Sequence, residues 1–158
     1  MTARERRPGH DAHGLRFVLV AARFNEAYVR RLVDAAREVL VRGGASESDL
    51  EVWWVPGSFE LPLASQWAAA SGRFDAVLAF GVLIRGETEH FRLVAEAAAH
   101  GLVRVALDSS VPVLNGVLAV QDAEQAAART GGPLGNRGAD VALAALQMAG
   151  LARERSRP

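Results

Sequence analysis

Short apolar runs alternate with amphipathic helical patterns along nearly the whole chain, and this alternation is the strongest constraint on its fold. The segment from Glu26 to Arg42 illustrates the helical pattern, with one apolar stripe and a charged opposite face. Alternating strands and helices predict βα units around a mostly parallel sheet. The predicted strands are Leu15–Ala22, Leu50–Val55, Ala76–Ile84, Leu102–Leu107 and Val113–Val120.

Capping residues and glycines set the expected ends of the helices. Asn25 stands at the N-cap of the first helix, and Gly43-Gly44 ends it. Gly101 is expected to close the third helix just after His100, which would cap its last carbonyl groups. The predicted helices are Glu26–Arg42, Phe59–Ser71 with Ser58 as its cap, a helix that ends at His100, Asp122–Arg129 and Ala139–Arg153.

A single domain fits the chain length of 158 residues, half of which are hydrophobic. We expect this domain to span residues 15–153, between a flexible arm (residues 1–14) and a frayed tail (residues 154–158). The arm is charged and has no apolar stretch, so no secretory signal is expected. The Gly-rich stretch Thr130–Gly138 is expected to separate the last two helices without dividing the domain.

The composition excludes several classes of function. The chain has no cysteine, and all 18 of its basic residues are arginine, which excludes thiol nucleophiles, cysteine-ligated metals and lysine Schiff bases. The 18 acidic residues balance the charge, and no apolar run is long enough for a membrane span. We therefore expect a cytoplasmic protein without nucleic-acid or membrane partners, whose anionic ligands are held by arginine or backbone N–H groups.

Candidate site residues follow the predicted strands, because ligands bind beyond the carboxyl ends of the strands in open α/β sheets. The loops there carry two aromatic residues, Phe24 and Phe59, and the carboxylate of Glu60. His90 lies in the first turn of a helix, where the dipole favours a neutral imidazole that can accept a proton. An ordinary surface histidine is the simpler explanation of this residue taken alone.

The loop before His90 favours a functional role. Gly86, Glu87 and Thr88 place backbone N–H groups at a helix start, which is an anion site by geometry. The carboxylates of Glu87 and Glu89 weigh against phosphate there unless they point away. Arg129 has two interpretations, because a cation at a helix end is stabilising in itself and its planar guanidinium could also clamp a phosphate.

Six motifs, in order, carry a resemblance to a known family, and together they span about residues 15–151. With them, the chain resembles the 6,7-dimethyl-8-ribityllumazine synthases of riboflavin biosynthesis. The motifs are Arg23-Phe24-Asn25, Val55-Pro56-Gly57-Ser58-Phe59-Glu60-Leu61-Pro62, Gly81-Val82-Leu83-Ile84-Arg85-Gly86-Glu87-Thr88-Glu89-His90-Phe91, Asn115-Gly116-Val117-Leu118, Glu124-Gln125-Ala126 with Arg129, and Gly135-Asn136-Arg137-Gly138.

The resemblance implies an α/β fold, a flavodoxin-like three-layer αβα sandwich with a central, mostly parallel four-stranded sheet. It implies a homo-oligomer, either a pentamer or an icosahedral shell of pentamers, and names riboflavin synthase as a candidate partner. It also implies the condensation of 5-amino-6-(D-ribitylamino)uracil with 3,4-dihydroxy-2-butanone 4-phosphate, which releases phosphate and water. No cofactor or metal is implied, since the imine forms between the two substrates.

The resemblance also implies residue roles. The pyrimidine ring and ribityl chain would be held by Phe24, by Ser58, Phe59 and Glu60, and by Val82, Leu83 and Ile84. Glu87 and Thr88 would present backbone N–H groups to the butanone phosphate, and His90 would transfer protons. Asn115 and Arg129 would come from a neighbouring subunit, with Arg129 gripping the phosphate.

Some positions depart from the family pattern. Asn115 stands where many members have phenylalanine, Ala119 replaces a common threonine, and Arg137 replaces a common lysine. These departures keep open a non-catalytic relative that binds flavin or lumazine and forms a shell. The related archaeal-type riboflavin synthase is a further alternative, which the intact segment from Gly86 to Phe91 argues against. A generic nucleotide-binding module is disfavoured because no Gly-rich dinucleotide fingerprint follows a strand.

Overall fold

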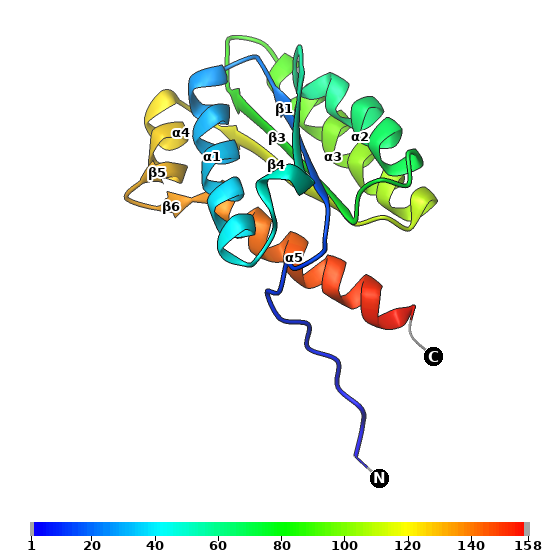
Figure 1. Cartoon of the computed structure of the whole chain (residues 1–158). Helices are drawn as coiled ribbons and strands as arrows, with labels where there is room; N and C mark the ends of the chain where they lie inside the picture. Colours follow the sequence, from blue (N-terminus) through cyan, green and yellow to red (C-terminus); the bar gives the residue numbers. More distant parts are fainter. Residues whose placement is uncertain (1, 157–158) are drawn as a thin grey trace.

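A four-stranded sheet lies between two layers of helices in the computed structural model, which describes residues 2–156 (Figure 1). Its strands are all parallel and have the order β2-β1-β3-β4, so the expected three-layer α/β fold is confirmed. The elements are β1 (Phe17–Ala22), α1 (Glu26–Arg42), β2 (Leu50–Val55), α2 (Leu61–Ala70), β3 (Ala76–Ile84), α3 (His90–Ser109), β4 (Val113–Val120), α4 (Ala123–Arg129), β5 (Thr130–Gly132), β6 (Gly135–Asn136) and α5 (Arg137–Arg155), with short 3₁₀ turns at Glu47–Asp49 and Ser58–Glu60.

The continuous apolar runs of β1 and β3 are explained by helices on both faces of the sheet. Helices α1, α4 and α5 cover one face and α2 and α3 the other (Figure 1). Since successive side chains of a strand point to opposite faces, Phe17 and Leu19 pack toward α1 and α5, whereas Val18 and Val20 pack toward α2 and α3. Both faces of the two central strands are therefore core.

The predicted strand Leu102–Leu107 is wrong, because this segment belongs to α3. The buried residues Val94, Ala98, Leu102 and Val105 recur at helical spacing along that helix. Gly101 does not end the helix, since one interior glycine costs only about 1 kcal/mol. A Cβ at Gly101 would lie 2.6 Å from Pro62 Cγ, so the glycine permits close packing of α3 on α2. His100 accordingly lies inside the helix rather than at its cap.

Within the Gly-rich stretch, Thr130–Gly132 and Gly135–Asn136 form a small antiparallel hairpin, β5 and β6. Helix α5 begins at Arg137, two residues before the expected start. Asn136 caps it there, since its Oδ1 accepts a hydrogen bond of 2.8 Å from the Gly138 N–H. Ser58 is not the side-chain cap of α2, because a 3₁₀ turn precedes that helix and Glu60 occupies the N-cap.

Part of the arm expected over residues 1–14 packs on the domain. Ala12 is fully buried, and its N–H donates a hydrogen bond of 2.9 Å to the Gly43 carbonyl. His10 and Gln147 of α5 lie within hydrogen-bond distance of each other, at 3.1 Å. Met1 of the arm, and residues 157–158 of the expected tail, lie outside the described residues.

We expect Gly138→Ala to destabilise the chain by about 1–3 kcal/mol, because a Cβ there would overlap the backbone carbonyl of Leu32. The backbone of α1 cannot yield as a flexible side chain would. Urea unfolding at fixed protein concentration measures the change. Gly9→Ala is the control, since a Cβ there meets nothing within 4 Å, and equal stability of the two variants would contradict the packing argument.

Candidate functional site

The sheet divides at its carboxyl end, between β1 and β3. Their ladder ends at the pair Ala21–Phe80. Beyond that pair, β1 stays with β2, since Arg23 N–H donates to the Val55 carbonyl at 2.8 Å. Strand β3 stays with β4, which it pairs as far as Ile84. The chain leaves β1 toward β2 in one direction and continues from β3 to β4 in the other, so this is the switch point where open α/β sheets bind ligands.

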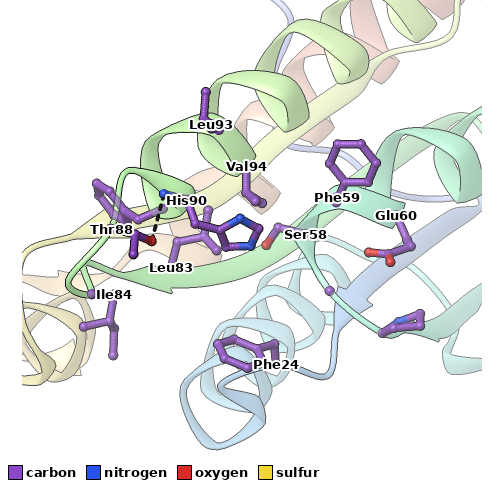
Figure 2. Close-up of a pocket in the computed structure, with 14 residues that line it drawn as sticks. Phe24, Ser58, Phe59, Glu60, Leu83, Ile84, Thr88, His90, Leu93 and Val94 are labelled. Carbon is purple, nitrogen blue, oxygen red and sulfur yellow. Dashed lines mark hydrogen bonds between the residues drawn. The ribbon is translucent and has the colours of Figure 1, made fainter.

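A cavity of about 760 Å³ opens at this division (Figure 2). One wall comes from the loops after β1 and β2, and the other from the end of β3 and the start of α3. The lining residues are Phe24, Pro56, Gly57, Ser58, Phe59, Glu60, Leu83, Ile84, Gly86, Thr88, His90, Phe91, Leu93 and Val94. Its volume is within the range typical of small-molecule sites.

Aromatic and apolar groups make up the part of the cavity nearest the strand ends. Phe24 and Phe59 are both about two-thirds exposed, at 68% and 66%, so both rings are accessible to a ligand in the cavity. Phe24 lies across the cavity from Leu83 (Figure 2). Exposed ring faces beside aliphatic side chains form a slot that suits a planar heterocycle.

Polar side chains also line the cavity. Ser58 is nearly buried, and its Oγ lies so close to Gly81 that a Cβ there would overlap it. The side chains of Ser58 and His90 both point into the middle of the cavity (Figure 2). The carboxylate of Glu60 lies near Gly57, with Oε2 3.4 Å from the position of a Cβ on that glycine.

His90 is the first residue of α3, and the preceding loop holds its backbone. Its N–H donates to Thr88 Oγ1 at 3.3 Å (Figure 2). Glu87 and Glu89, whose carboxylates would repel a phosphate, do not line the cavity. Arg92 Nε donates to Glu89 Oε2 at 2.9 Å, and this hydrogen bond lowers the pKa of the Glu89 carboxyl. The Glu89 charge is therefore paired along α3 rather than directed at the cavity.

Four of the predicted site residues do not line this cavity. The Val82 side chain is fully buried in the core on the α1 and α5 side, because it alternates with the lining residue Leu83. Glu87 lies in the loop but outside the lining. Asn115 is exposed on β4, where its Oδ1 accepts from the Val117 N–H. Arg129 ends α4, where it donates to the Gln125 carbonyl at 3.2 Å.

The lining therefore contains no arginine from its own chain. A ligand phosphate here would meet the positive end of the α3 dipole and His90, but no permanent cation among the lining residues. Arg129 and Asn115, if they act on a ligand in such a cavity, must belong to another copy of the chain. The cavity of one chain therefore has an aromatic slot and a helix N-terminus, but no permanent positive charge to pair with a phosphate.

Sequence reasoning missed Leu93 and Val94, which line the cavity beside His90. They lie three and four residues after His90 on the same helix, so they share its face. That spacing could have indicated that they line the same cavity as His90, although two apolar residues at this spacing also fit an ordinary core-facing stripe. Pro56, Gly57 and Phe91 also line the cavity without a predicted role, and Gly86 lines it as part of the predicted anion site.

No helix within residues 2–156 is both long and apolar enough to cross a membrane. No group of three or more His, Asp or Glu side chains in this part of the chain could hold a metal ion.

Comparison with known proteins gives consistent matches over nearly the whole chain. Residues 14–153 match the family described as 6,7-dimethyl-8-ribityllumazine synthase. Proteins of that name are 51% identical in Halorhodospira halophila, over 88% of this chain and 89% of that protein, and 46% identical in Chlorobium phaeobacteroides, over 91% and 93%. The chloroplastic protein of that name in Arabidopsis thaliana is 47% identical over 87% of this chain, which spans 61% of the plant protein.

Proposed function

The chain belongs to the 6,7-dimethyl-8-ribityllumazine synthase family, and we propose that the cavity at the β1–β3 division is where its two substrates are joined. The chain is an enzyme of riboflavin biosynthesis, a transferase. It condenses 5-amino-6-(D-ribitylamino)uracil with 3,4-dihydroxy-2-butanone 4-phosphate, giving 6,7-dimethyl-8-ribityllumazine, phosphate and water. The observation that carries this placement is one cavity lined by an aromatic slot and by a helix start with its histidine.

The aromatic slot suits the pyrimidine. Its ring lies against Phe24, between that side chain and the aliphatic groups of Leu83 and Ile84, which line the same cavity. The segment Ser58–Glu60 lies beside the slot, where the Glu60 carboxylate can accept hydrogen bonds from ribityl hydroxyls. Val82 contributes through its backbone only, since its side chain is in the core.

The butanone phosphate belongs at the start of α3. A helix N-terminus favours an anion through its dipole and its backbone N–H groups, and the loop at Glu87 and Thr88 supplies those groups. Arg129 of a neighbouring copy adds the permanent charge that the lining lacks, and Asn115 approaches from the same copy. Two substrates held at the two ends of one cavity have their reacting amine and carbonyl close together.

The chemistry then needs orientation and proton transfer. The 5-amino group attacks the butanone carbonyl, and water leaves as the imine forms. Loss of the C3 proton and of phosphate leaves an enol, which tautomerises to a new carbonyl at C3. The ribityl-bearing nitrogen attacks that carbonyl and closes the ring with loss of a second water. Holding the two reactants together can supply about 7–11 kcal/mol. A positioned proton-transfer group, here His90, typically adds about 10²- to 10⁴-fold.

The assembly that brings in Arg129 is a pentamer or an icosahedral shell of pentamers. Its support in the chain is an apolar outer surface on α2 and α3, where Leu63, Trp67, Val103 and Leu107 are each more than half exposed. Apolar patches of this kind mark protein interfaces. Native mass and electron microscopy measure the assembly. A cytoplasmic location and an association with riboflavin synthase are part of the same proposal.

The deciding assay mixes the purified protein with both substrates and follows lumazine absorbance, with native mass measured on the same sample. Formation of lumazine only when both substrates are present supports the proposal. Riboflavin formed from lumazine alone would identify the archaeal-type synthase instead. An assembly that binds lumazine without turnover would identify the non-catalytic relative.

We expect His90→Ala to lower kcat by about 10²-fold, with little change in KM for either substrate, because proton transfer is lost while the reactants stay positioned. Steady-state kinetics measures both constants. His100→Ala is the matched control, since it removes an exposed histidine of the same helix that lies outside the cavity lining. Equal activities of the two variants would show that His90 does not transfer protons in the reaction.

A further inference from the structure

Asn25 has a backbone conformation that few residues adopt. Its φ and ψ of 60° and 38° place it in the left-handed region at the start of α1. Among non-glycine residues in the described chain, only Asn25 and Ser110 have positive φ. Asparagine tolerates this region better than other non-glycine residues do. The predicted N-cap position is confirmed, but its side chain makes no capping hydrogen bond to the helix.

The Asn25 side chain instead reaches across the division of the sheet. Its Nδ2 donates a hydrogen bond of 2.7 Å to the backbone carbonyl of Val82 on β3. That carbonyl lies two residues past the last β1–β3 pair, Ala21–Phe80, so the backbone of β1 no longer supplies a donor. The amide of Asn25 takes the place of the missing ladder partner.

This hydrogen bond connects the two walls of the cavity. Asn25 directly follows Phe24 on one wall, and Val82 directly precedes Leu83 and Ile84 on the other. The backbone of the same loop is otherwise tied to the β2 side, since the Phe24 N–H donates to the Pro56 carbonyl at 3.2 Å. Within residues 2–156, the Asn25–Val82 bond is the one hydrogen bond between residues 23–25 and β3.

We propose that Asn25 is a positioning residue that sets the width of the cavity, and with it the gap between the Phe24 ring and the β3 wall. The inference rests on the proposed function, because that gap matters for catalysis only if it holds the pyrimidine. Asn25 lies outside the cavity lining. It acts through Phe24 on one wall and through Leu83 and Ile84 on the other.

The geometry explains why asparagine suits this position. Glycine adopts the left-handed conformation freely but has no side chain to donate. Aspartate is similar in size and tolerates the conformation, but its carboxylate would face the Val82 carbonyl with no hydrogen to share. Both substitutions therefore remove the hydrogen bond to Val82 and keep the left-handed backbone conformation. Glycine removes the side chain, whereas aspartate removes only the donor.

The test compares Asn25→Gly and Asn25→Asp with the wild type in the lumazine assay and in thermal unfolding. We expect both variants to lose about 10- to 100-fold in kcat/KM for the ribitylaminouracil, mainly through a higher KM, since small displacements of positioning groups have effects of this size. KM for the butanone phosphate should change less than about threefold, because the α3 loop that holds it is untouched. The unfolding midpoint of Asn25→Gly should stay close to that of the wild type.

Ser110→Gly is the matched control, because it relieves the other positive φ, at the end of α3 and outside the cavity lining. Its kinetics should equal those of the wild type. Wild-type kinetics in either Asn25→Gly or Asn25→Asp would overturn the inference, since neither residue can donate to Val82. A wild type that makes no lumazine would instead overturn the proposed function, so the two failures are distinguishable.

Discussion

Arg129→Ala is expected to lose about 10³-fold in kcat/KM, more than His90→Ala, while the chain still folds and assembles. The lining of one chain's cavity contains no arginine, and the chain has no lysine to substitute. The substrate phosphate carries nearly two negative charges at neutral pH. Truncating one partner of a buried, hydrogen-bonded charge pair costs about 2–5 kcal/mol, and each 1.4 kcal/mol is about tenfold.

The competing explanation of Arg129 is purely structural. The residue ends α4 and its Nη1 donates to the Gln125 carbonyl, which is a favourable place for a cation beside the negative end of a helix dipole. That interaction contributes about 0.3–1 kcal/mol to stability. If it were the whole role, Arg129→Ala would lower the unfolding free energy slightly and leave the kinetics unchanged.

Steady-state kinetics with each substrate varied in turn separates these roles, with the largest effect expected on the butanone phosphate. Arg42→Ala is the matched control, because Arg42 is the last residue of α1 as Arg129 is of α4. Arg129→Lys should be intermediate, since it keeps the charge but lacks the planar fork that binds phosphate bidentately. An inactive His90→Ala beside a near-normal Arg129→Ala would show that the two roles are misassigned.

Much of the fold could be predicted because several local signals agree. Helix α1 has the predicted bounds, Glu26–Arg42, since an N-cap residue, an amphipathic stripe and a glycine pair all mark the same segment. Strands β2, β3 and β4 also have their predicted bounds. The segment Leu102–Leu107 was mispredicted because a short apolar run has no periodicity that separates a strand from a buried helix. The structure removes the ambiguity through the buried residues at helical spacing and the close packing of Gly101 on Pro62.

The part of the site that follows from the strand order of the sheet could be predicted from the sequence. The carboxyl ends of parallel strands share one edge of the sheet, and the structure indeed brings Phe24, Glu60 and His90 to one cavity. Two features depend on more than the order of elements. Val82 turns its side chain to the core because strand residues alternate, and the hydrogen bond of Asn25 to Val82 depends on how far β1 and β3 diverge.

Arg129 and Asn115 mark the limit of reasoning from one chain. Both lie outside the cavity of their own chain, so no local pattern connects them to it. The roles proposed for them rest on the family resemblance and, for Arg129 alone, also on the charge that the lining lacks. The decisive evidence for them must come from an experiment in which two chains share a site.

Co-assembly of two impaired variants is expected to raise activity well above that of either variant alone. One variant, Phe24→Ala with His90→Ala, has a defective cavity and an intact Arg129, and the other, Arg129→Ala, has an intact cavity. In a ring of head-to-tail contacts, a normal site forms wherever the intact cavity of one variant meets the Arg129 of the other. Random mixing at equal amounts places such a contact at about a quarter of the interfaces.

The variants should be co-expressed with different affinity tags and purified on both, so that only mixed assemblies are assayed. Activity near a quarter of the wild-type value, far above either parent, requires that cavity and arginine come from different chains. A control co-assembly of Phe24→Ala/His90→Ala with His90→Ala should be no more active than His90→Ala alone, because no normal cavity can form. Mixed assemblies no more active than the average of their parents would place the whole site in one chain, and Arg129 would then have to act on the cavity of its own chain, whose lining does not include it.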